Sequence, residues 1–311
     1  MTSRLYVVAT PIGNLSDLGE RARRILLEVD LVAAEDTRVT QVLLRHVGAR
    51  ARTIRADEHN QQRAAQSVLE HLRAGHSVAL VSDAGTPAIS DPGNAIVAAA
   101  HEAGFAVVPI PGPSAVTALL SAAGLADGPF LFEGFLPARA SNRDARLKLV
   151  AQAADQAGAT LVLYEAPHRI TATLEAIAQR FGAHRTIAIG RELTKTFEEI
   201  WRGTAAEAPQ WLAQRPERTR GEFVIAIGRA PATALDAQAS AGTSIDPQEL
   251  LASLLPELGT SRAVRLAQRL TGLAHRELYA RALALNGEAG EQQDDPPDDA
   301  GRQPGPLGDE R

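Results

Sequence analysis

The stretch VALVSDAGTPAISDPG, residues 78–93, joins an apolar run to a polar loop rich in glycine and proline. Residues 77–81 are predicted to form a strand buried on both faces, because their apolar side chains follow one another without alternation. We expect Asp91 to cap, and Pro92 to begin, a helix over residues 94–103. The loop would then lie at the carboxyl end of a buried strand, where open α/β sheets bind ligands, and it contains Asp83, Gly85, Thr86 and Pro87. The competing interpretation is an ordinary βα loop with a capping aspartate.

Composition indicates a soluble globular protein. The chain has 311 residues, of which 45% are hydrophobic and 22% charged, and this length suggests roughly two domains. No apolar run approaches the roughly 18 residues of a membrane span, and the N-terminus does not have the layout of a signal peptide, so we expect a cytoplasmic protein. With no cysteine and with eight scattered histidines, the sequence predicts neither disulfides nor a metal cofactor.

The net charge of −5 comes from the end of the chain. Residues 287–311 carry eight acids and two arginines, so the rest of the chain is near +1. This tail is rich in Asp, Pro, Gly and Gln and is predicted to be disordered. Only Lys148 and Lys195 are lysines among the 32 basic residues. A lysine kept among arginines could mark a site that needs a compact ammonium or a titratable amine, but chance explains either lysine alone better.

Polar clusters follow several predicted strands of the first half. Strand 5–9 leads to TPIGNLSD, in which Asp17 and Glu20 form a capping box for a helix over residues 18–28. This loop has one glycine where a dinucleotide fingerprint has three, which excludes a Rossmann dinucleotide site. Strands at 31–34 and 53–56 lead to the clusters EDTR and EHN, and helices at 40–46 and 61–73 follow. We therefore expect several charged strand ends on one rim.

A second sheet is predicted beyond residue 117. Strand 106–110 leads to PGPSAVT, in which Pro113 can open a helix and Ser114 can present its hydroxyl near the helix start. Further strands are predicted at 131–133, 160–165, 186–190 and 222–227, with helices at 142–156, 167–180 and 205–214. Polar groups again follow the strands. Two αβ domains with polar rims make the cleft between them the expected ligand site.

The end of the chain is predicted to be helical. Residues 230–243 resemble a linker, and short amphipathic helices follow at 247–255, 262–270 and 275–285. Five arginines stand against three acids between residues 248 and 286, which suits a helix-turn-helix module. A helical cap that only packs on the rest of the protein is the competing interpretation.

Seven motifs in order resemble the ribosomal RNA methyltransferases of the tetrapyrrole methylase superfamily. They are LYVVATPIGNLSD (5–17), AEDTR (34–38), EHN (58–60), VSDAGTPAISDPG (81–93), PIPGPS (109–114), YEAPHR (164–169) and RELTK (191–195). The resemblance covers roughly residues 5–229, and the helical end is similar to the C-terminal module of the same enzymes. It implies an α/β fold with two tandem αβα domains and a cleft between them. The domains would span 1–118 and 119–230, with a linker at 231–245, a helical module at 246–286 and the tail at 287–311.

The resemblance also implies a cofactor and a reaction. S-adenosylmethionine would lie in the cleft, and its methyl group would pass to the ribose 2′-oxygen of a cytidine in 16S ribosomal RNA. The implied cofactor residues are Ile12, Asp83, Gly85, Thr86, Pro87, Pro111, Gly112, Ser114, Ala115, Tyr164, Glu192 and Gly221. The glycine-rich first loop of the tetrapyrrole enzymes is replaced by TPIGN, which argues against a precorrin or uroporphyrinogen substrate.

A base within reach of the acceptor hydroxyl would help methyl transfer, and this base stays unassigned. The candidate residues for the chemistry at the acceptor are Glu35, Asp36, Arg38, His59 and Lys195. Lys195 could act as a base only if burial or nearby arginines lowered its pKa. The residues expected to bind the substrate are Asn14, Glu58, Asn60 and Arg191.

Two other functions were weighed. A tetrapyrrole C-methyltransferase would need an apolar pocket the size of a macrocycle, whereas the aromatic content of 4% and the basic helical end favour RNA. A non-catalytic RNA-binding protein would not need the loops at 82–93 and 111–114. We expect 16S ribosomal RNA or the small ribosomal subunit as partner, neither DNA nor a membrane, and a homodimer, because relatives form homodimers.

Overall fold

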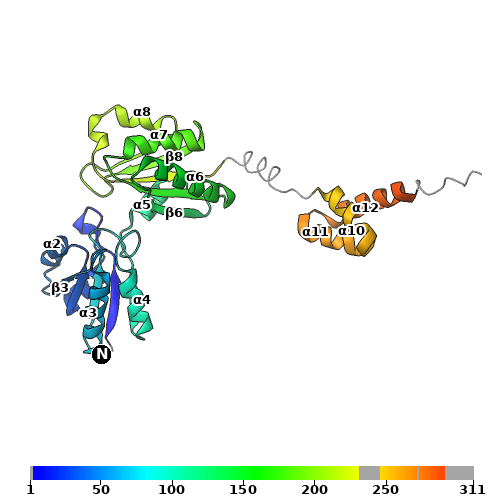
Figure 1. Cartoon of the computed structure of the whole chain (residues 1–311). Helices are drawn as coiled ribbons and strands as arrows, with labels where there is room; N and C mark the ends of the chain where they lie inside the picture. The colour runs from blue at the N-terminus through cyan, green and yellow to red at the C-terminus, as the bar shows by residue number, and fades with distance from the viewer. Residues whose placement is uncertain (1–2, 126, 231–245, 272, 291–311) are drawn as a thin grey trace, which may run out of the picture. The chain divides into compact units, whose positions relative to one another are not determined.

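The computed structural model describes residues 3–125, 127–230, 246–271 and 273–290 (Figure 1). The chain divides into two compact units, Met1–Pro231 and Ala232–Arg311, and each is described by itself. The first unit holds two sheets of five strands. Among the described residues, no helix has the length and apolarity that crossing a bilayer requires.

The first sheet is entirely parallel and has the strand order β3-β2-β4-β1-β5. Its strands are β1 (Arg4–Val8), β2 (Leu31–Ala34), β3 (Arg52–Arg55), β4 (Val78–Val81) and β5 (Ala106–Ile110). All residues of β2 and β4 are buried, as expected for inner strands covered by helices on both faces. The parallel arrangement brings the ends of β1, β2 and β4 to the same edge.

Helices cover both faces of this sheet (Figure 1). On one face, α1 (Glu20–Glu28) and α2 (Thr37–Val47) place Leu26 and Leu44 against the strands. On the other, α3 (Gln61–Arg73) and α4 (Asn94–Glu102) contribute Val68 and Ile96. The three layers leave only the sheet edges and the loops open to ligands.

The second sheet is mixed and has the order β6-β7-β10-β8-β9. Its strands are β6 (Phe130–Phe135), β7 (Thr160–Glu165), β8 (Thr186–Arg191), β9 (Glu199–Thr204) and β10 (Phe223–Ile227). Only β6 and β7 pair in parallel, and β10 runs antiparallel to both of its neighbours. β10 is buried throughout, so it forms the centre of this layer.

One helix links the two sheets. α5 (Ala115–Ala123) follows β5 directly, but its Leu119 and Leu120 pack on Val162 and Val224 of the second sheet. The opposite face is covered by α6 (Ala140–Gln156), α7 (Ile170–Phe181) and α8 (Ala208–Ala213). The two tandem αβα layers are thus confirmed, while the predicted boundary at residue 118 falls inside α5. Short 3₁₀ turns occur at η1 (Leu15–Asp17) and η2 (Pro216–Thr219).

The second unit contains three helices among its described residues. They are α10 (Pro247–Leu258), α11 (Thr260–Thr271) and α12 (His275–Gly290), and they enclose a small core around Leu251, Val264 and Leu278. This confirms the expected helical module. The predicted linker at 230–243 lies outside the described residues except for Ala230, and so does the predicted tail from residue 291 onward.

Three expectations about local structure were wrong. α1 begins at Glu20 with Gly19 as N-cap, and Asp17 belongs to η1, so there is no capping box. β9 was not predicted, because its sequence EIWRGT places charged residues among the apolar ones, as an edge strand can. α12 continues to Gly290, so residues 287–290 are helical.

Candidate functional site

The loops after β1 and β4 are joined where the two strands end. The N–H of Thr10 donates to the carbonyl oxygen of Gly85 at 2.8 Å, and the N–H of Gly85 donates back to Thr10 at 3.0 Å. The hydroxyl of Thr10 also donates to the carbonyl oxygen of Ser82 at 3.1 Å. Gly85 has a φ of +82°, a value that residues with side chains rarely adopt. This bridge fixes the loop that opens the site.

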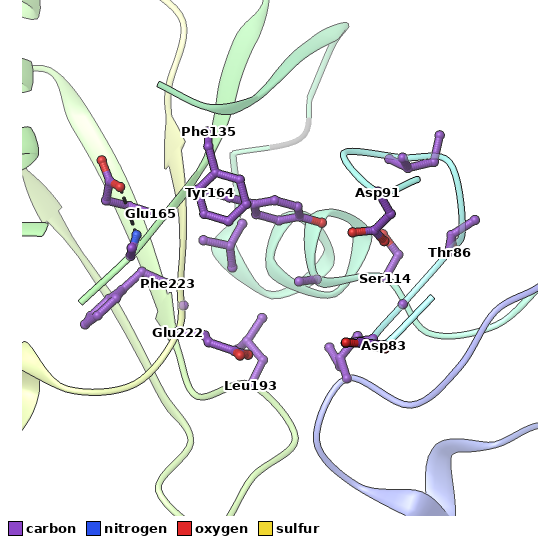
Figure 2. Close-up of a pocket in the computed structure, with 18 of the residues that line it drawn as sticks. Asp83, Thr86, Asp91, Ser114, Phe135, Tyr164, Glu165, Leu193, Glu222 and Phe223 are labelled. Atoms are coloured by element: carbon purple, nitrogen blue, oxygen red, sulfur yellow. Dashed lines mark hydrogen bonds between the residues drawn. The ribbon is translucent and has the colours of Figure 1, made fainter. Parts of the chain in front are cut away.

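A pocket of about 450 Å³ lies between the strand ends of the two sheets, within the usual size of a small-molecule site (Figure 2). Its walls come from the loops after β1, β2 and β4, from the start of α5, and from β6, β7, β8, β10 and the loop after β8. The lining residues are Ile12, Glu35, Asp83, Ala84, Gly85, Thr86, Ile89, Asp91, Ser114, Ala115, Phe135, Tyr164, Glu165, Ala166, Pro167, Gly190, Leu193, Glu222, Phe223 and Val224.

One wall of the pocket is acidic. The N–H of Asp36 donates to Oδ1 of Asp83 at 2.9 Å, and the N–H of Asp83 donates to Oε2 of Glu35 at 3.4 Å, so the ends of β2 and β4 hold each other. Burial raises the pKa of both Glu35 and Asp83 above the usual range. Asp91 completes this wall, and burial, assisted by the charge of Glu35, raises its pKa to about 6.

The facing wall is largely apolar. Tyr164 packs edge-on against Phe132 with ring centroids 4.9 Å apart and against Phe135 with centroids 5.5 Å apart. Leu193 in the loop after β8 and Val224 in β10 extend this surface. A ligand with a cationic part and a flat, less polar part matches both walls, because the carboxylates attract the charge and the rings provide contact area.

The loop of residues 82–93 contradicts the predicted helix cap. The N-cap of α4 is Gly93, with a φ of 135°, and Asp91 lines the pocket instead of capping. A Cβ on Gly93 would lie 2.9 Å from Cδ2 of Leu80, so a side chain at this position would displace the core. Ala88 and Ser90 also have positive φ values, of 66° and 64°. The backbone therefore turns Asp91 away from the helix end.

Seven of the predicted cofactor residues line the pocket together. They are Ile12, Asp83, Gly85, Thr86, Ser114, Ala115 and Tyr164. Five others do not line it: Pro87, Pro111, Gly112, Glu192 and Gly221. Gly112 instead allows its backbone to pack closely against Ala9, since a Cβ added at position 112 would lie 3.0 Å from the Cβ of Ala9. Gly221 makes room for the side chain of Glu192, which a Cβ would approach to 2.5 Å.

Only Glu35 of the residues expected at the acceptor lines the pocket. The guanidinium of Arg38 is exposed and paired with Asp36, which also caps α2. Asn14 caps η1 by accepting the N–H of Ser16 at 3.0 Å. Three others, which follow the edge strand β3, are also absent from the pocket: Glu58, His59 and Asn60.

Arg191, expected to bind the substrate, is engaged in contacts within the protein. Its buried guanidinium donates to the carbonyl oxygens of Arg220 at 2.8 Å, Glu217 at 2.9 Å and Phe197 at 3.2 Å. These bonds occupy the side chain and hold the loop after β8. Arg191 therefore supports one wall of the pocket from behind.

The amine of Lys195 is paired with two glutamates. Its Nζ lies 2.9 Å from Oε1 of Glu192 and 3.0 Å from Oε2 of Glu222. Burial lowers the pKa of the amine, but these two hydrogen bonds outweigh it, and the pKa is raised overall. The stem of the side chain packs against Gly13. Lys195 thus connects the loop after β1 to the second sheet.

We expect Lys195→Met to lower stability by about 1 kcal/mol, because methionine keeps the stem but loses both ion pairs. The pH dependence of methyl transfer should stay that of the wild type, since no proton is taken by the amine. Chemical denaturation and a pH profile of single-turnover rates test this. If an ionisation that limits the wild-type rate were absent from the pH profile of the variant, Lys195 would again be a candidate base.

Sequence reasoning missed most of the apolar wall and three acids. The missed lining residues are Ala84, Ile89, Asp91, Phe135, Glu165, Ala166, Pro167, Gly190, Leu193, Glu222, Phe223 and Val224. Several of them neighbour predicted positions, as Leu193 neighbours Glu192 and Glu222 neighbours Gly221. The strand ends were therefore the correct signal, but the sequence does not show which of two neighbouring loop residues faces the pocket.

Comparisons with families place the chain among methylases. The model of the Tetrapyrrole (Corrin/Porphyrin) Methylases matches residues 4–209, and that of the RsmI C-terminal HTH domain matches residues 241–286.

Individual proteins are similar to this chain over most of its length. Two similar proteins are named ribosomal RNA small subunit methyltransferase I. The one from Mesorhizobium japonicum is 44% identical to this chain, and the match covers 92% of this chain and 94% of the relative. The one from Escherichia coli O157:H7 is 42% identical, and the match covers 91% of this chain and 96% of the relative. Among solved structures, the methyltransferase CobJ is similar with a TM-score of 0.55 and 20% identity, covering 73% of this chain and 95% of that one. Uroporphyrin-III C-methyltransferase from Thermus thermophilus, complexed with S-adenosyl homocysteine, has a TM-score of 0.50 at 19% identity, covering 72% and 97%. These two likenesses concern the fold.

Proposed function

The chain belongs to the tetrapyrrole methylase family, among the ribosomal RNA small subunit methyltransferases I, and we propose that it methylates small-subunit ribosomal RNA with S-adenosylmethionine as donor. The proposed acceptor is the ribose 2′-oxygen of a cytidine in 16S ribosomal RNA. The observation that carries the proposal is the pocket with one acidic and one aromatic wall. When bound, S-adenosylmethionine supplies an electrophilic methyl group on a positively charged sulfur.

The residues of the pocket fit this cofactor in charge and shape. Glu35 and Asp83 give a negative wall toward a ligand that carries a sulfonium and an ammonium. Tyr164 and Phe135 offer ring faces and edges to the adenine. The backbone of Gly85 lets the ligand approach the loop closely, because no side chain stands there. We assign the seven lining residues predicted from the sequence to cofactor binding.

The chain contributes to the rate mainly by positioning. Methyl transfer needs the acceptor oxygen in line with the methyl group, and a fixed geometry removes much of the entropic barrier. The bridge between Thr10 and Gly85 and the contacts of Arg191 hold opposite walls of the pocket in place.

We propose that the helical module holds RNA through its arginines. On α11, Arg262, Arg265 and Arg269 are exposed and recur at three- and four-residue spacing, which places them along one side of the helix. The buried residues Ala263, Val264 and Ala267 face the core of the module. An arginine row of this kind suits the phosphate backbone of RNA.

Substitution of Arg262, Arg265 and Arg269 together by glutamine should weaken RNA binding ~10- to 100-fold at about 0.1 M salt, with the salt slope lower by about 2–3. The effect follows from the counterions that three phosphate contacts release. Cofactor affinity should not change. Binding of ribosomal RNA at several salt concentrations measures both quantities.

A charge-matched control is the triple glutamine substitution at Arg21, Arg23 and Arg24, three exposed arginines of α1. It removes the same charge from the other unit and should leave the salt slope nearly unchanged. An equal loss in both variants would mean that net charge, and not the module, attracts the RNA.

We also propose that the enzyme works in the cytoplasm as a homodimer. The edge strand β9 and the loop before it carry Phe197, which is 71% exposed, and Ile200, which is 41% exposed. Burial of these side chains against a second copy would remove apolar surface from water. Light scattering of the purified chain tests the dimer.

Transfer of radiolabelled methyl groups tests the activity. The full chain is incubated with labelled S-adenosylmethionine and with small subunits from cells that have no copy of this enzyme. Label should enter the ribosomal RNA, and subunits from cells that contain the enzyme should accept little. Equal labelling of both subunit preparations, or of neither, would contradict the proposed function.

A further inference from the structure

Asp91 projects into the pocket from a loop that the fold holds in an unusual shape. The positive φ values of Ala88, Ser90 and Gly93 bend residues 88–93 away from α4. Such values in residues other than glycine are unfavourable, and they persist only where the surroundings determine them. The strain delivers Asp91 to the pocket instead of to the helix end, where an aspartate would be a good cap.

The second sheet holds this loop from the other side. Gly134 of β6 has a φ of +76°, and a Cβ there would lie 2.5 Å from Oγ of Ser90. The pairing of β6 with β7 shifts register between Phe132 and Gly134, as at a β-bulge. The bulge, together with the absence of a side chain on Gly134, thus makes room for Ser90, the residue directly before Asp91. The position of Asp91 is therefore fixed from both sheets.

The surroundings of Asp91 suit a group that takes up a proton near neutral pH. Figure 2 shows its carboxylate and the hydroxyl of Tyr164 pointing toward one another across the pocket. The groups that act on it are the carboxylates of Glu35 and Asp83 and the hydroxyl of Ser82. Burial and the charge of Glu35 raise its pKa to about 6, although the hydroxyl of Ser82 opposes the shift.

We propose that Asp91 is the general base of the reaction and accepts the proton of the ribose 2′-hydroxyl, an inference that rests on the proposed function. The O–H bond breaks toward the carboxylate of Asp91 while the oxygen forms a bond to the methyl carbon. The bond from this carbon to sulfur breaks with its electron pair on sulfur, so the sulfonium becomes a neutral thioether. Asp91 ends protonated and releases its proton to water after the product leaves.

The other candidate bases are engaged or misplaced. The carboxylates of Glu35 and Asp83 accept backbone N–H groups that join the ends of β2 and β4. Lys195 is held as an ammonium by two glutamates. His59 does not line the pocket. Two further lining carboxylates, Glu165 and Glu222, are paired with Arg169 and Lys195. Asp91 is therefore the lining carboxyl group that is neither in an ion pair nor used to join strand ends.

The test compares Asp91→Asn with Asp91→Glu and with Glu102→Gln, an exposed position on α4. Single-turnover transfer is measured at saturating cofactor and RNA. The wild-type rate should fall tenfold per pH unit below about pH 6, because protonated Asp91 cannot act as a base. Asp91→Asn should be ~10²- to 10⁴-fold slower and should lose this acidic limb. Asp91→Glu should recover part of the rate, and Glu102→Gln should match the wild type.

Two further measurements separate the possible outcomes. Calorimetry should give Asp91→Asn a cofactor affinity close to that of the wild type; loss of affinity with a normal rate at saturation would make Asp91 a cofactor ligand and overturn the proposal. Carboxyl NMR of the protein without RNA should show a group that titrates near pH 6 and that disappears in Asp91→Asn. Titration near pH 4 would also overturn it. The NMR result stands even if the wild type does not methylate RNA, so failure of the proposed function is distinguishable.

Discussion

Gly85→Val should weaken S-adenosylmethionine binding by roughly 100-fold or more, equivalent to about 2.7 kcal/mol. Gly85 lines the pocket with a φ of +82°, and a Cβ there would lie 3.5 Å from Cγ2 of Ile12, another lining residue. The branches of valine would enter the space that we assign to the ligand. The positive φ would also strain the bridge to Thr10. Calorimetry with S-adenosylmethionine measures the loss.

Gly75→Val is the matched control for backbone strain. Gly75 has a φ of +88°, and a Cβ there would meet no atom within 4 Å. Both variants should therefore lose similar stability, whereas only Gly85→Val should lose the cofactor. If Gly75→Val reduced binding as strongly, the effect would come from general destabilisation. If Gly85→Val bound normally, the loop after β4 would not belong to the cofactor site.

Glu165→Ala should destabilise the first unit by about 3–5 kcal/mol, because it leaves the guanidinium of Arg169 without its countercharge. The side chain of Glu165 is fully buried, and Oε1 lies 3.1 Å from Nε of Arg169. Its carboxylate also accepts the hydroxyl of Thr173 at 2.5 Å and the N–H of Ala166 at 2.8 Å. The substitution removes the contacts that join the start of α7 to the end of β7. Chemical denaturation gives the change in free energy of unfolding.

The exposed pair of Arg24 and Glu28 has the same spacing of four residues and provides the control. Its side chains are 64% and 61% exposed. Glu28→Ala should change stability by less than about 1 kcal/mol, since water screens such a pair. Equal effects at Glu28 and Glu165 would show that burial does not govern the strength of these ion pairs.

Strands with continuous apolar sequence could be predicted well. The bounds expected for β2, β5 and β7 match the structure. β2 and most of β7 are buried, as their apolar sequence predicts, and β5 is an edge strand that the apolar run AVVPI still marks. β9 lies at the edge of its sheet and mixes charged with apolar residues, so no run marks it. The register between strands decides such elements, and a single sequence does not display it.

The site was predictable as a set of loops but not residue by residue. Asp91 followed by proline and glycine has the local pattern of a helix cap, and only the positive φ values of the loop turn it into the pocket. The role of Lys195 depends on Glu222, 27 positions along the chain. Arg191 binds carbonyl oxygens of three loop residues, contacts that composition does not reveal. Contacts with residues distant in the sequence determine the role of each of these side chains.

The most direct test of the account is nucleoside mass spectrometry of small-subunit ribosomal RNA after incubation with the purified chain and S-adenosylmethionine. The RNA comes from cells without the enzyme, is digested to nucleosides, and is compared with RNA treated with the Gly85→Val variant. The account predicts one new 2′-O-methylcytidine per RNA with the wild type and almost none with the variant. Methylation on a base, or no RNA methylation together with methyl transfer to a tetrapyrrole, would contradict it.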